Sequence, residues 1–179
     1  MSLKKAVRKV FGGRHTGALP AGSAAPGFSL KNLDGSQVSL AVALRSGPVL
    51  AAFFKINCPT CQFTFPFLER LYETYRSSKF TLLGISQNDG ADTREFCKEY
   101  GIKFPVLLDG QGYPASNDYG LTNVPTLFLI STDATIQETS VGFVKADLER
   151  LAALAAQAAG KAANTLFKPG EVIPESKPG

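Results

Sequence analysis

The 179-residue chain has few of the residues from which metal sites and disulfide-bonded scaffolds are built. It contains three cysteines, one histidine, one methionine and no tryptophan. Three cysteines are too few for the dense disulfide network that stabilises small secreted domains. A structural zinc site usually takes four ligands, and beyond one cysteine pair the chain offers only Cys97, His15 and carboxylates. No metal site is therefore predicted.

Long apolar runs and large patches of a single charge are also missing. No segment approaches the ~20 consecutive apolar residues that a transmembrane helix needs. The net charge of +4 arises from 19 lysines and arginines and 15 acidic residues, and the basic residues are spread among the acidic ones except at the N-terminus. This distribution does not indicate a nucleic-acid partner.

Basic and apolar residues interleave at the start of the chain until Gly12-Gly13 breaks the pattern. A secretory signal needs an uninterrupted apolar stretch of about 7–15 residues after its charges, so we expect the protein to be retained in the cytoplasm. The segment Met1 to Phe11 has the spacing of a short amphipathic helix that could contact a membrane surface, but a solvated terminal segment is the favoured interpretation. Residues 1–22 are expected to form a basic N-terminal arm.

The remaining chain predicts one α/β domain over residues 23–160. With 44% hydrophobic residues, the chain can bury one substantial core. Strands are predicted near 28–30, 37–40, 49–56, 80–86, 105–108, 126–131 and 135–141, and helices after residue 61, at 91–100, before 119 and at 145–159. This alternation, with a late hairpin, favours a mixed β-sheet. Lysine, proline, glycine and glutamate dominate from Thr165 onward, so residues 161–179 are expected to form an extended or disordered tail.

A Cys-Pro-Thr-Cys segment lies where a predicted strand meets a predicted helix. The start of a helix carries free N–H groups and a partial positive charge, which favour the thiolate form of the first cysteine, Cys58. The two-residue spacing lets Cys61 close a disulfide with it inside the first helical turn, and Pro59 preorganises that turn. The pattern predicts a redox-active cysteine pair.

Two other interpretations of this pair remain. The same spacing supplies half of many zinc sites, and buried cysteines often pack as small apolar side chains. The shortage of further ligands disfavours the first. The flanking Pro59 and Thr60, at a strand-to-helix junction, disfavour the second.

Several segments occur in an order that resembles a known family. They are residues 25–30 (APGFSL), 58–61 (CPTC), Pro66, 100–109 and 124–130 (VPTLFLI). Together they resemble the redoxin branch of the thioredoxin superfamily, and within it the TlpA/ResA-like thiol-disulfide oxidoreductases, which border the AhpC/TSA peroxiredoxins. The resemblance covers about residues 23–160. It implies a thioredoxin-like fold: a central mixed β-sheet flanked by helices, with an N-terminal β-hairpin and an inserted αβ element.

The resemblance also implies roles for individual residues. Cys58 corresponds to the exposed attacking cysteine, Cys61 to the resolving cysteine, and Pro66 to the proline that kinks the active-site helix. Pro125 corresponds to a cis-proline that faces the disulfide, and Val124 offers backbone groups to an extended substrate. The implied substrate groove is bordered by Pro59, Thr60, Val124 and Pro125. No cofactor beyond the redox-active disulfide is implied, and the implied partners are protein thiol or disulfide clients and an electron donor such as a thioredoxin or a reductase.

The sequence departs from this pattern close to the cysteine pair. Ala52 stands where thioredoxins carry a buried aspartate, so proton transfer would need water, Lys55 or another group. Asn57 replaces the tryptophan that often precedes the first cysteine. Peroxiredoxins use P-x-x-x-T-x-x-C, and here Ala51 and Lys55 occupy the proline and threonine positions. Efficient peroxide reduction is therefore not expected.

Other polar residues have simpler interpretations than catalysis. Lys55 could stabilise a thiolate by its charge, but a solvated lysine is the simpler reading. Cys97 is interpreted as a spectator thiol, and His15 as a solvated residue outside the domain. One of Asp89 and Asp92 is expected to cap a helix.

The favoured function is thiol-disulfide exchange with protein partners through a mixed disulfide on Cys58. One alternative is a peroxiredoxin-like thiol peroxidase, in which Cys58 is oxidised to sulfenate and Cys61 condenses with it. A second alternative is a non-catalytic redox sensor or binding module that uses the groove beside Pro125.

Overall fold

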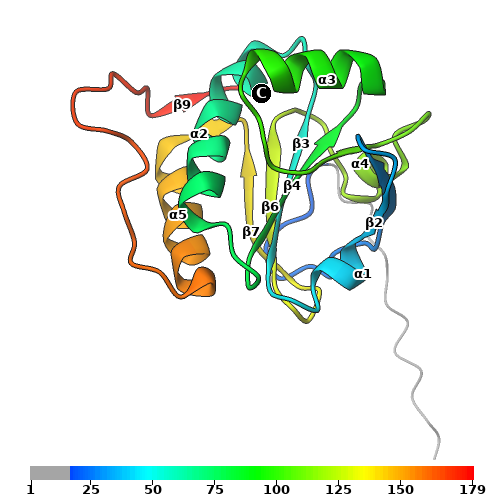
Figure 1. Ribbon diagram of the computed structural model, residues 1–179, viewed down its shortest axis with the longest axis horizontal. Helices are drawn as coiled ribbons and strands as arrows, with labels where there is room; N and C mark the ends of the chain where they lie inside the picture. The colour runs from blue at the N-terminus through cyan, green and yellow to red at the C-terminus, as the bar shows by residue number, and fades with distance from the viewer. Residues whose placement is uncertain (1–16) are drawn as a thin grey trace, which may run out of the picture.

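The computed structural model describes residues 17–179, which form a mixed β-sheet with helices on both faces (Figure 1). The strands are β1 (Ser29–Asn32), β2 (Gln37–Ser39), β3 (Val49–Phe54), β4 (Thr81–Ser86), β5 (Val106–Leu108), β6 (Thr126–Ile130), β7 (Ile136–Val141), β8 (Phe143–Val144) and β9 (Ser176–Lys177). The helices are α1 (Leu40–Ala43), α2 (Pro59–Tyr75), α3 (Gly90–Glu99), α4 (Pro114–Asp118) and α5 (Lys145–Ala159). The predicted fold class and the order of the predicted elements are confirmed.

The main sheet has the strand order β2-β1-β5-β4-β3-β6-β7. Strands β3, β4 and β5 are parallel to one another. The β1–β2 hairpin joins β5 in antiparallel fashion, and β6 and β7 add to the other side of β3, also antiparallel. The start of β6 therefore lies beside the end of β3, because neighbouring antiparallel strands run in opposite directions. The short α1 was not predicted, since its four residues are too few to show a helical period.

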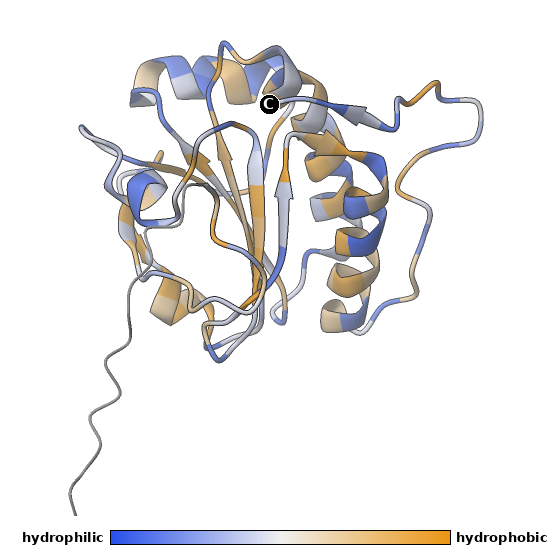
Figure 2. Ribbon diagram, turned by 180° about the vertical axis from the view of Figure 1, so that it is seen from behind, coloured by the Kyte–Doolittle hydropathy of each residue, from blue (hydrophilic) through white to orange (hydrophobic). Residues whose placement is uncertain are grey.

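The apolar character of β3 on both of its faces is explained by its place inside the sheet. All six of its residues are fully buried. Leu50, Ala52 and Phe54 face a core shared with α2, α3 and α5. The alternate residues of β3 face a second core shared with α1 and α4. Figure 2 shows apolar residues along the inner strands and alternating apolar and polar stretches on the helices.

Helix α2 begins immediately after the first cysteine. Pro59 occupies its first turn, where the missing N–H is not needed. Its buried side chains recur at three- and four-residue steps, and the largest of them include Phe65, Leu68 and Leu71. Pro66 lies inside the helix with its ring exposed to solvent, so the helix buries one face while the proline points outward.

The C-terminal tail, residues 161–179, contributes to the core. Leu166 and Phe167 are 5% and 6% exposed and pack in the same cluster as α2 and α5. Further along, β9 pairs with β8 in a small antiparallel sheet. Composition suggested disorder because proline, glycine and charged residues dominate the segment. Buried apolar side chains, the β8–β9 pairing and an ion pair join the segment to the domain.

The ion pair joins Arg70 of α2 to Glu171 of the tail through two hydrogen bonds of 2.9 and 2.8 Å. The Arg70 guanidinium and the Lys168 backbone N–H lower the pKa of Glu171 to about 2 from an ordinary value of 4.5. A carboxyl whose pKa is lowered on folding contributes stability above its unfolded pKa, and this contribution is lost as the pH falls towards the folded pKa.

We expect Glu171→Gln to lower the urea midpoint of unfolding near pH 7, and the difference from the unchanged chain to shrink between about pH 4.5 and about pH 2. Glu175→Gln is a suitable control because the Glu175 side chain is 86% exposed. A difference between the Glu171 variant and the unchanged chain that does not vary with pH would contradict the assignment of the pKa shift to this pair.

Part of the predicted N-terminal arm, including the segment Met1 to Phe11 and His15, lies outside the described residues. Its last residues lie beside the end of α4 and the start of β7, where the Leu19 N–H donates to the Tyr119 carbonyl oxygen and the Gly22 N–H donates to the Ile136 carbonyl oxygen. Within residues 17–179, no helix combines the length and apolar character required to cross a bilayer.

Candidate active site

The two cysteines lie at the start of α2, just after the turn that connects β3 to this helix. Cys58 is the N-cap residue of α2, and its sulfur accepts a hydrogen bond from the Cys61 backbone N–H at 3.3 Å. Both residues are free thiols in this structure. The Cys58 side chain is half-buried, while Cys61 is fully buried. The first sulfur is therefore the accessible one, and the second faces the core.

The two thiols differ in reactivity because they are buried to different extents. Desolvation raises the pKa of Cys61 far above its ordinary value, and its contacts with Cys58 raise it further. A thiol of this kind stays protonated at neutral pH and reacts poorly with external reagents. The backbone N–H that points at the Cys58 sulfur, in contrast, would stabilise negative charge on that atom.

We expect iodoacetamide to modify Cys58 well before the other two thiols of the reduced protein, because Cys61 is 0% exposed and Cys97 is partly buried with its pKa raised to about 11. Peptide mapping by mass spectrometry after brief labelling near pH 8 measures the order. Labelling in 6 M guanidinium chloride is the control, since all three thiols should then react alike. Cys61 reacting first in the folded protein would reverse the proposed roles.

A loop from a distant part of the chain meets the first cysteine. The Cys58 thiol donates to the Val124 carbonyl oxygen at 3.2 Å, although the two residues are 66 positions apart. The Val124–Pro125 peptide bond is cis, which is the geometry that the family resemblance implied. The contact arises because Thr126, at the start of β6, pairs with Phe53 near the end of β3.

The turn that presents Cys58 is held by residues that sequence reasoning missed. The Ile56 N–H donates to the Asn88 side chain at 3.0 Å, and the Gln62 side chain donates to the Ile56 carbonyl at 2.8 Å. Asn88 follows β4, the parallel neighbour of β3. Only the adjacency of the two strands identifies it, because nothing in its local sequence marks it as a partner of the cysteine turn.

The remaining predicted site residues are arranged unevenly around the sulfurs. Thr60 is buried, and its hydroxyl donates to the Pro178 carbonyl at 2.6 Å. Asn57 and Pro59 are exposed. The Lys55 ammonium lies 5.9 Å from the centroid of the Tyr113 ring, and within residues 17–179 it makes no hydrogen bond to either sulfur. The structure therefore directs Lys55 towards an aromatic ring, and no described contact supports a role in stabilising the thiolate.

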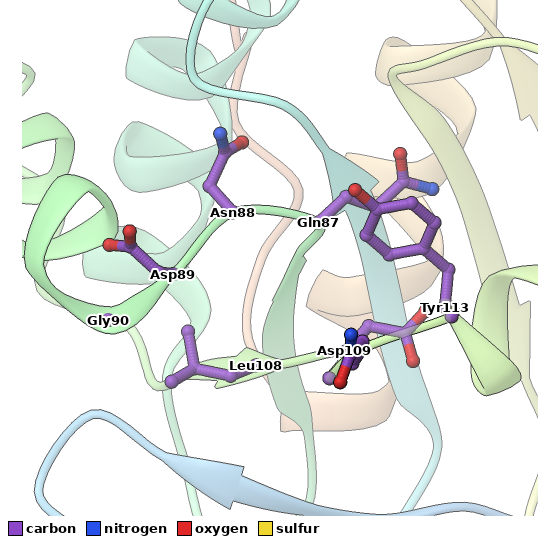
Figure 3. A pocket seen from close by; sticks show the side chains of 10 residues that line it. Gln87, Asn88, Asp89, Gly90, Leu108, Asp109 and Tyr113 are labelled. Carbon is purple, nitrogen blue, oxygen red and sulfur yellow. The ribbon is translucent and has the colours of Figure 1, made fainter.

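Beside this site lies an open hollow of about 470 Å³ at the carboxyl ends of β4 and β5 (Figure 3). Residues 87–90 and 108–113 line it. Its buried carboxylate, Asp109, accepts hydrogen bonds from the backbone of Ala115 and from the backbone and hydroxyl of Ser116. Asp109 is thus fully engaged in holding the start of α4. Tyr113, at the rim, has a left-handed backbone with φ of 52°.

Two further residues considered in the sequence lie in or next to α3. Asp89 is the N-cap, and its carboxylate accepts from the Asp92 N–H at 2.9 Å, which confirms the expected cap. Cys97 is a free, partly buried thiol that packs against the core containing Phe96. Within the described residues, no group of three or more histidine, cysteine or acidic side chains is gathered as a metal site requires.

A sheet of this topology, with a half-buried and a fully buried cysteine at the start of α2 and a cis-proline loop against the first sulfur, defines a thiol-disulfide oxidoreductase of the thioredoxin-like class. The model of the AhpC/TSA family matches residues 21–139, and the chain belongs to this family. The predicted recognition is therefore confirmed.

Relatives with similar sequences carry names that agree with this class. The thioredoxin-like protein YneN of Bacillus subtilis is 31% identical over 134 residues, covering 72% of this chain and 76% of the relative. The thiol-disulfide oxidoreductase ResA of Bacillus anthracis is 29% identical over 122 residues, covering 68% and 69%.

Solved structures show the same fold. A thiol:disulfide interchange protein of the thioredoxin family from Chlorobium tepidum is 30% identical with a TM-score of 0.63, covering 77% of this chain and 97% of the other. A thiol:disulfide interchange protein from Bacteroides sp. has a TM-score of 0.68 at 22% identity, covering 80% and 93%. The second likeness concerns the fold alone.

Proposed function

We propose that the protein exchanges its Cys58–Cys61 dithiol with disulfides of protein clients through a mixed disulfide on Cys58. The observation that carries this proposal is the position of the Cys58 sulfur, between the Cys61 N–H at 3.3 Å and the Val124 carbonyl at 3.2 Å. The Cys61 N–H carries a partial positive charge that would stabilise a thiolate at Cys58. The Val124 carbonyl belongs to a backbone segment that can pair with an extended client.

The exchange proceeds in two balanced steps. The Cys58 thiolate attacks one sulfur of the client disulfide, so that a mixed disulfide forms and the other client sulfur leaves as a thiolate. Cys61 then loses its proton and attacks the Cys58 sulfur, which releases the second client thiolate and closes the Cys58–Cys61 disulfide. The client gains two electrons and the protein loses two. The reverse sequence oxidises a client dithiol.

The burial of Cys61 makes its deprotonation the demanding part of the second step. Its pKa is raised by desolvation, and Ala52, at the place of the thioredoxin aspartate, is fully buried and has no titratable group. We infer that the departing client thiolate, or water that enters with the client, accepts this proton. The mixed disulfide should therefore be longer-lived at low pH than at high pH.

The proposal includes a second partner that restores the dithiol. An external dithiol protein, such as a thioredoxin or a reductase, would attack the Cys58–Cys61 disulfide at its accessible sulfur, Cys58, because Cys61 is fully buried. The same mixed-disulfide chemistry then runs in the opposite direction, and the two electrons come from the donor dithiol.

The test compares a disulfide-bonded peptide with hydrogen peroxide as oxidants of the reduced protein. We expect exchange with the peptide and a peroxide rate constant far below the roughly 10⁶ M⁻¹s⁻¹ of efficient enzymes, because Ala51 and Lys55 stand where peroxiredoxins carry proline and threonine. A peroxide rate at that level favours the thiol-peroxidase alternative. A reversible internal disulfide with no exchange with the peptide favours the sensor alternative.

A further inference from the structure

The last residues of the chain lie across the proposed active site. Figure 1 shows β9 and the C-terminal end beside the start of α2. The Pro178 carbonyl accepts the hydrogen bond from the Thr60 hydroxyl, between the two cysteines, at 2.6 Å. The Asn123 side chain donates to the Gly179 backbone oxygen at 3.1 Å. Segment 175–179 therefore contacts both sides of the site, α2 and the cis-proline loop.

This segment is attached as an added strand. Phe143 pairs with Lys177 and Val144 with Ser176 in antiparallel register. The Lys145 N–H donates to the Glu175 carbonyl at 2.9 Å. In an antiparallel ladder, hydrogen-bonded pairs alternate with pairs that are not hydrogen-bonded. Lys145 and Glu175 form a hydrogen-bonded pair, so the next hydrogen-bonded pair is Phe143 with Lys177. Addition of a strand to a free sheet edge is also how extended peptides are commonly recognised.

Close backbone approach marks the ends of this attachment. A β-carbon at position 179 would lie 2.7 Å from the Val124 carbonyl oxygen, and one at position 142 would lie 2.6 Å from the Lys177 carbonyl oxygen. Both distances are shorter than atoms tolerate, so glycine at 142 and 179 permits the contact. The Val124 carbonyl oxygen is the same atom that accepts the hydrogen bond from the Cys58 thiol.

We propose that segment 175–179 is an internal pseudo-substrate that occupies the client-binding surface and that a client must displace. The proposal rests on the proposed function, because it takes the surface beside Val124 and Thr60 as the place where the client binds. It also specifies the client: an extended peptide that pairs with β8 and offers a backbone acceptor to the Thr60 hydroxyl.

The upstream tail is anchored independently of this segment. Leu166 and Phe167 are buried in the core, and Glu171 is held by Arg70. Between these anchors and β9, Val172 is 97% exposed. Within and after β9, Ser176, Pro178 and Gly179 are also exposed. Segment 175–179 can therefore leave the surface while the anchors keep it nearby at a high effective concentration.

The test uses two variants of the full chain that should release the segment. Gly179→Leu places a side chain against the Val124 oxygen, and Lys177→Pro removes the N–H that pairs with Phe143. Release is measured by hydrogen exchange of the Lys145 amide, which is bonded to Glu175. Activity is measured as the rate constant for a disulfide-bonded peptide relative to that for hydroxyethyl disulfide, which is too small to need the whole surface.

We expect both variants to speed exchange of the Lys145 amide and to raise the peptide rate relative to the small disulfide by about tenfold, as for a surface that is free only about one-tenth of the time. Val172→Leu, which adds bulk at an exposed tail position, should change neither quantity. Released segments with an unchanged rate ratio would overturn the proposal, and so would a Lys145 amide that exchanges as fast in the unchanged chain as in the variants.

These outcomes are distinguishable from failure of the proposed function. If the unchanged chain reacts with neither disulfide, exchange chemistry itself is absent. In that case, hydrogen exchange of the Lys145 amide and iodoacetamide labelling of Cys58 still report whether segment 175–179 covers the site. Faster labelling of Cys58 in the two variants than in the Val172→Leu control supports the covering contact, and equal labelling contradicts it.

Discussion

Replacing Cys58 with serine is expected to reduce disulfide exchange by at least about a thousandfold. A hydroxyl at this position is not ionised at neutral pH and cannot form the mixed disulfide, so removing the attacking thiol removes the reaction and not merely one stabilising contact. The buried Cys61 cannot substitute for it, because it is 0% exposed and its pKa is raised. Turnover of a disulfide-bonded peptide with dithiothreitol as donor measures the loss.

Two companion variants separate the roles of the three cysteines. Cys61→Ser should still attack a client but should stop at the mixed disulfide, which accumulates on non-reducing gels and is released by dithiothreitol. Cys97→Ser should retain activity within about twofold, because this thiol is partly buried on α3 and is not a hydrogen-bond partner of the Cys58 sulfur. Retention of exchange by Cys58→Ser, or its loss in Cys97→Ser, would reassign the nucleophile.

Replacing Phe65 with alanine is expected to lower the free energy of unfolding by about 3–5 kcal/mol, which is the usual cost of deleting a fully buried phenylalanine ring. Phe65 is 0% exposed. Its ring centroid lies 4.2 Å from that of Phe54, 5.6 Å from Phe96 and 5.8 Å from Phe104. The ring thus joins α2, which carries the cysteines, to β3, α3 and the segment before β5.

Urea unfolding followed by circular dichroism measures this loss. Val172→Ala is the control, since that side chain is 97% exposed and exposed substitutions usually change stability by less than about 0.5 kcal/mol. A loss below about 1 kcal/mol for Phe65→Ala would mean that the aromatic cluster closes around the cavity or does not hold α2 in place.

Local patterns in the sequence were sufficient to predict the elements around the cysteine pair. The run 49–56 is apolar at both odd and even positions, which predicts a strand covered on both faces, and β3 is buried on both faces. The step from this run to CPTC and then to a helical period predicts a thiol pair at a helix start, and α2 begins at Pro59. These features depend on residues adjacent in the chain, whose intrinsic preferences act without reference to distant segments.

The position of Pro125 beside Cys58 was predicted from the family resemblance and not from the local sequence pattern. Nothing in its neighbours places it beside Cys58, and only the known order of motifs in related proteins suggested the contact. In the structure, the contact follows from the antiparallel pairing of β6 with β3. Asn88, which holds the Ile56 N–H, is placed similarly by the pairing of β4 with β3.

The sequence by itself thus determined the strand–helix junction, the cysteine pair and the alternating α/β order, because hydrophobic period, proline position and helix-start chemistry are local properties. Only the tertiary structure decided which backbone oxygen accepts the hydrogen bond from the Cys58 thiol and where the tail lies. Composition suggested a loose tail after Thr165, yet Leu166 and Phe167 enter the core and Pro178 reaches Thr60. Burial and strand pairing join residues that are far apart in the chain. The local sequence pattern of a segment does not show which distant core or strand edge that segment will pack against.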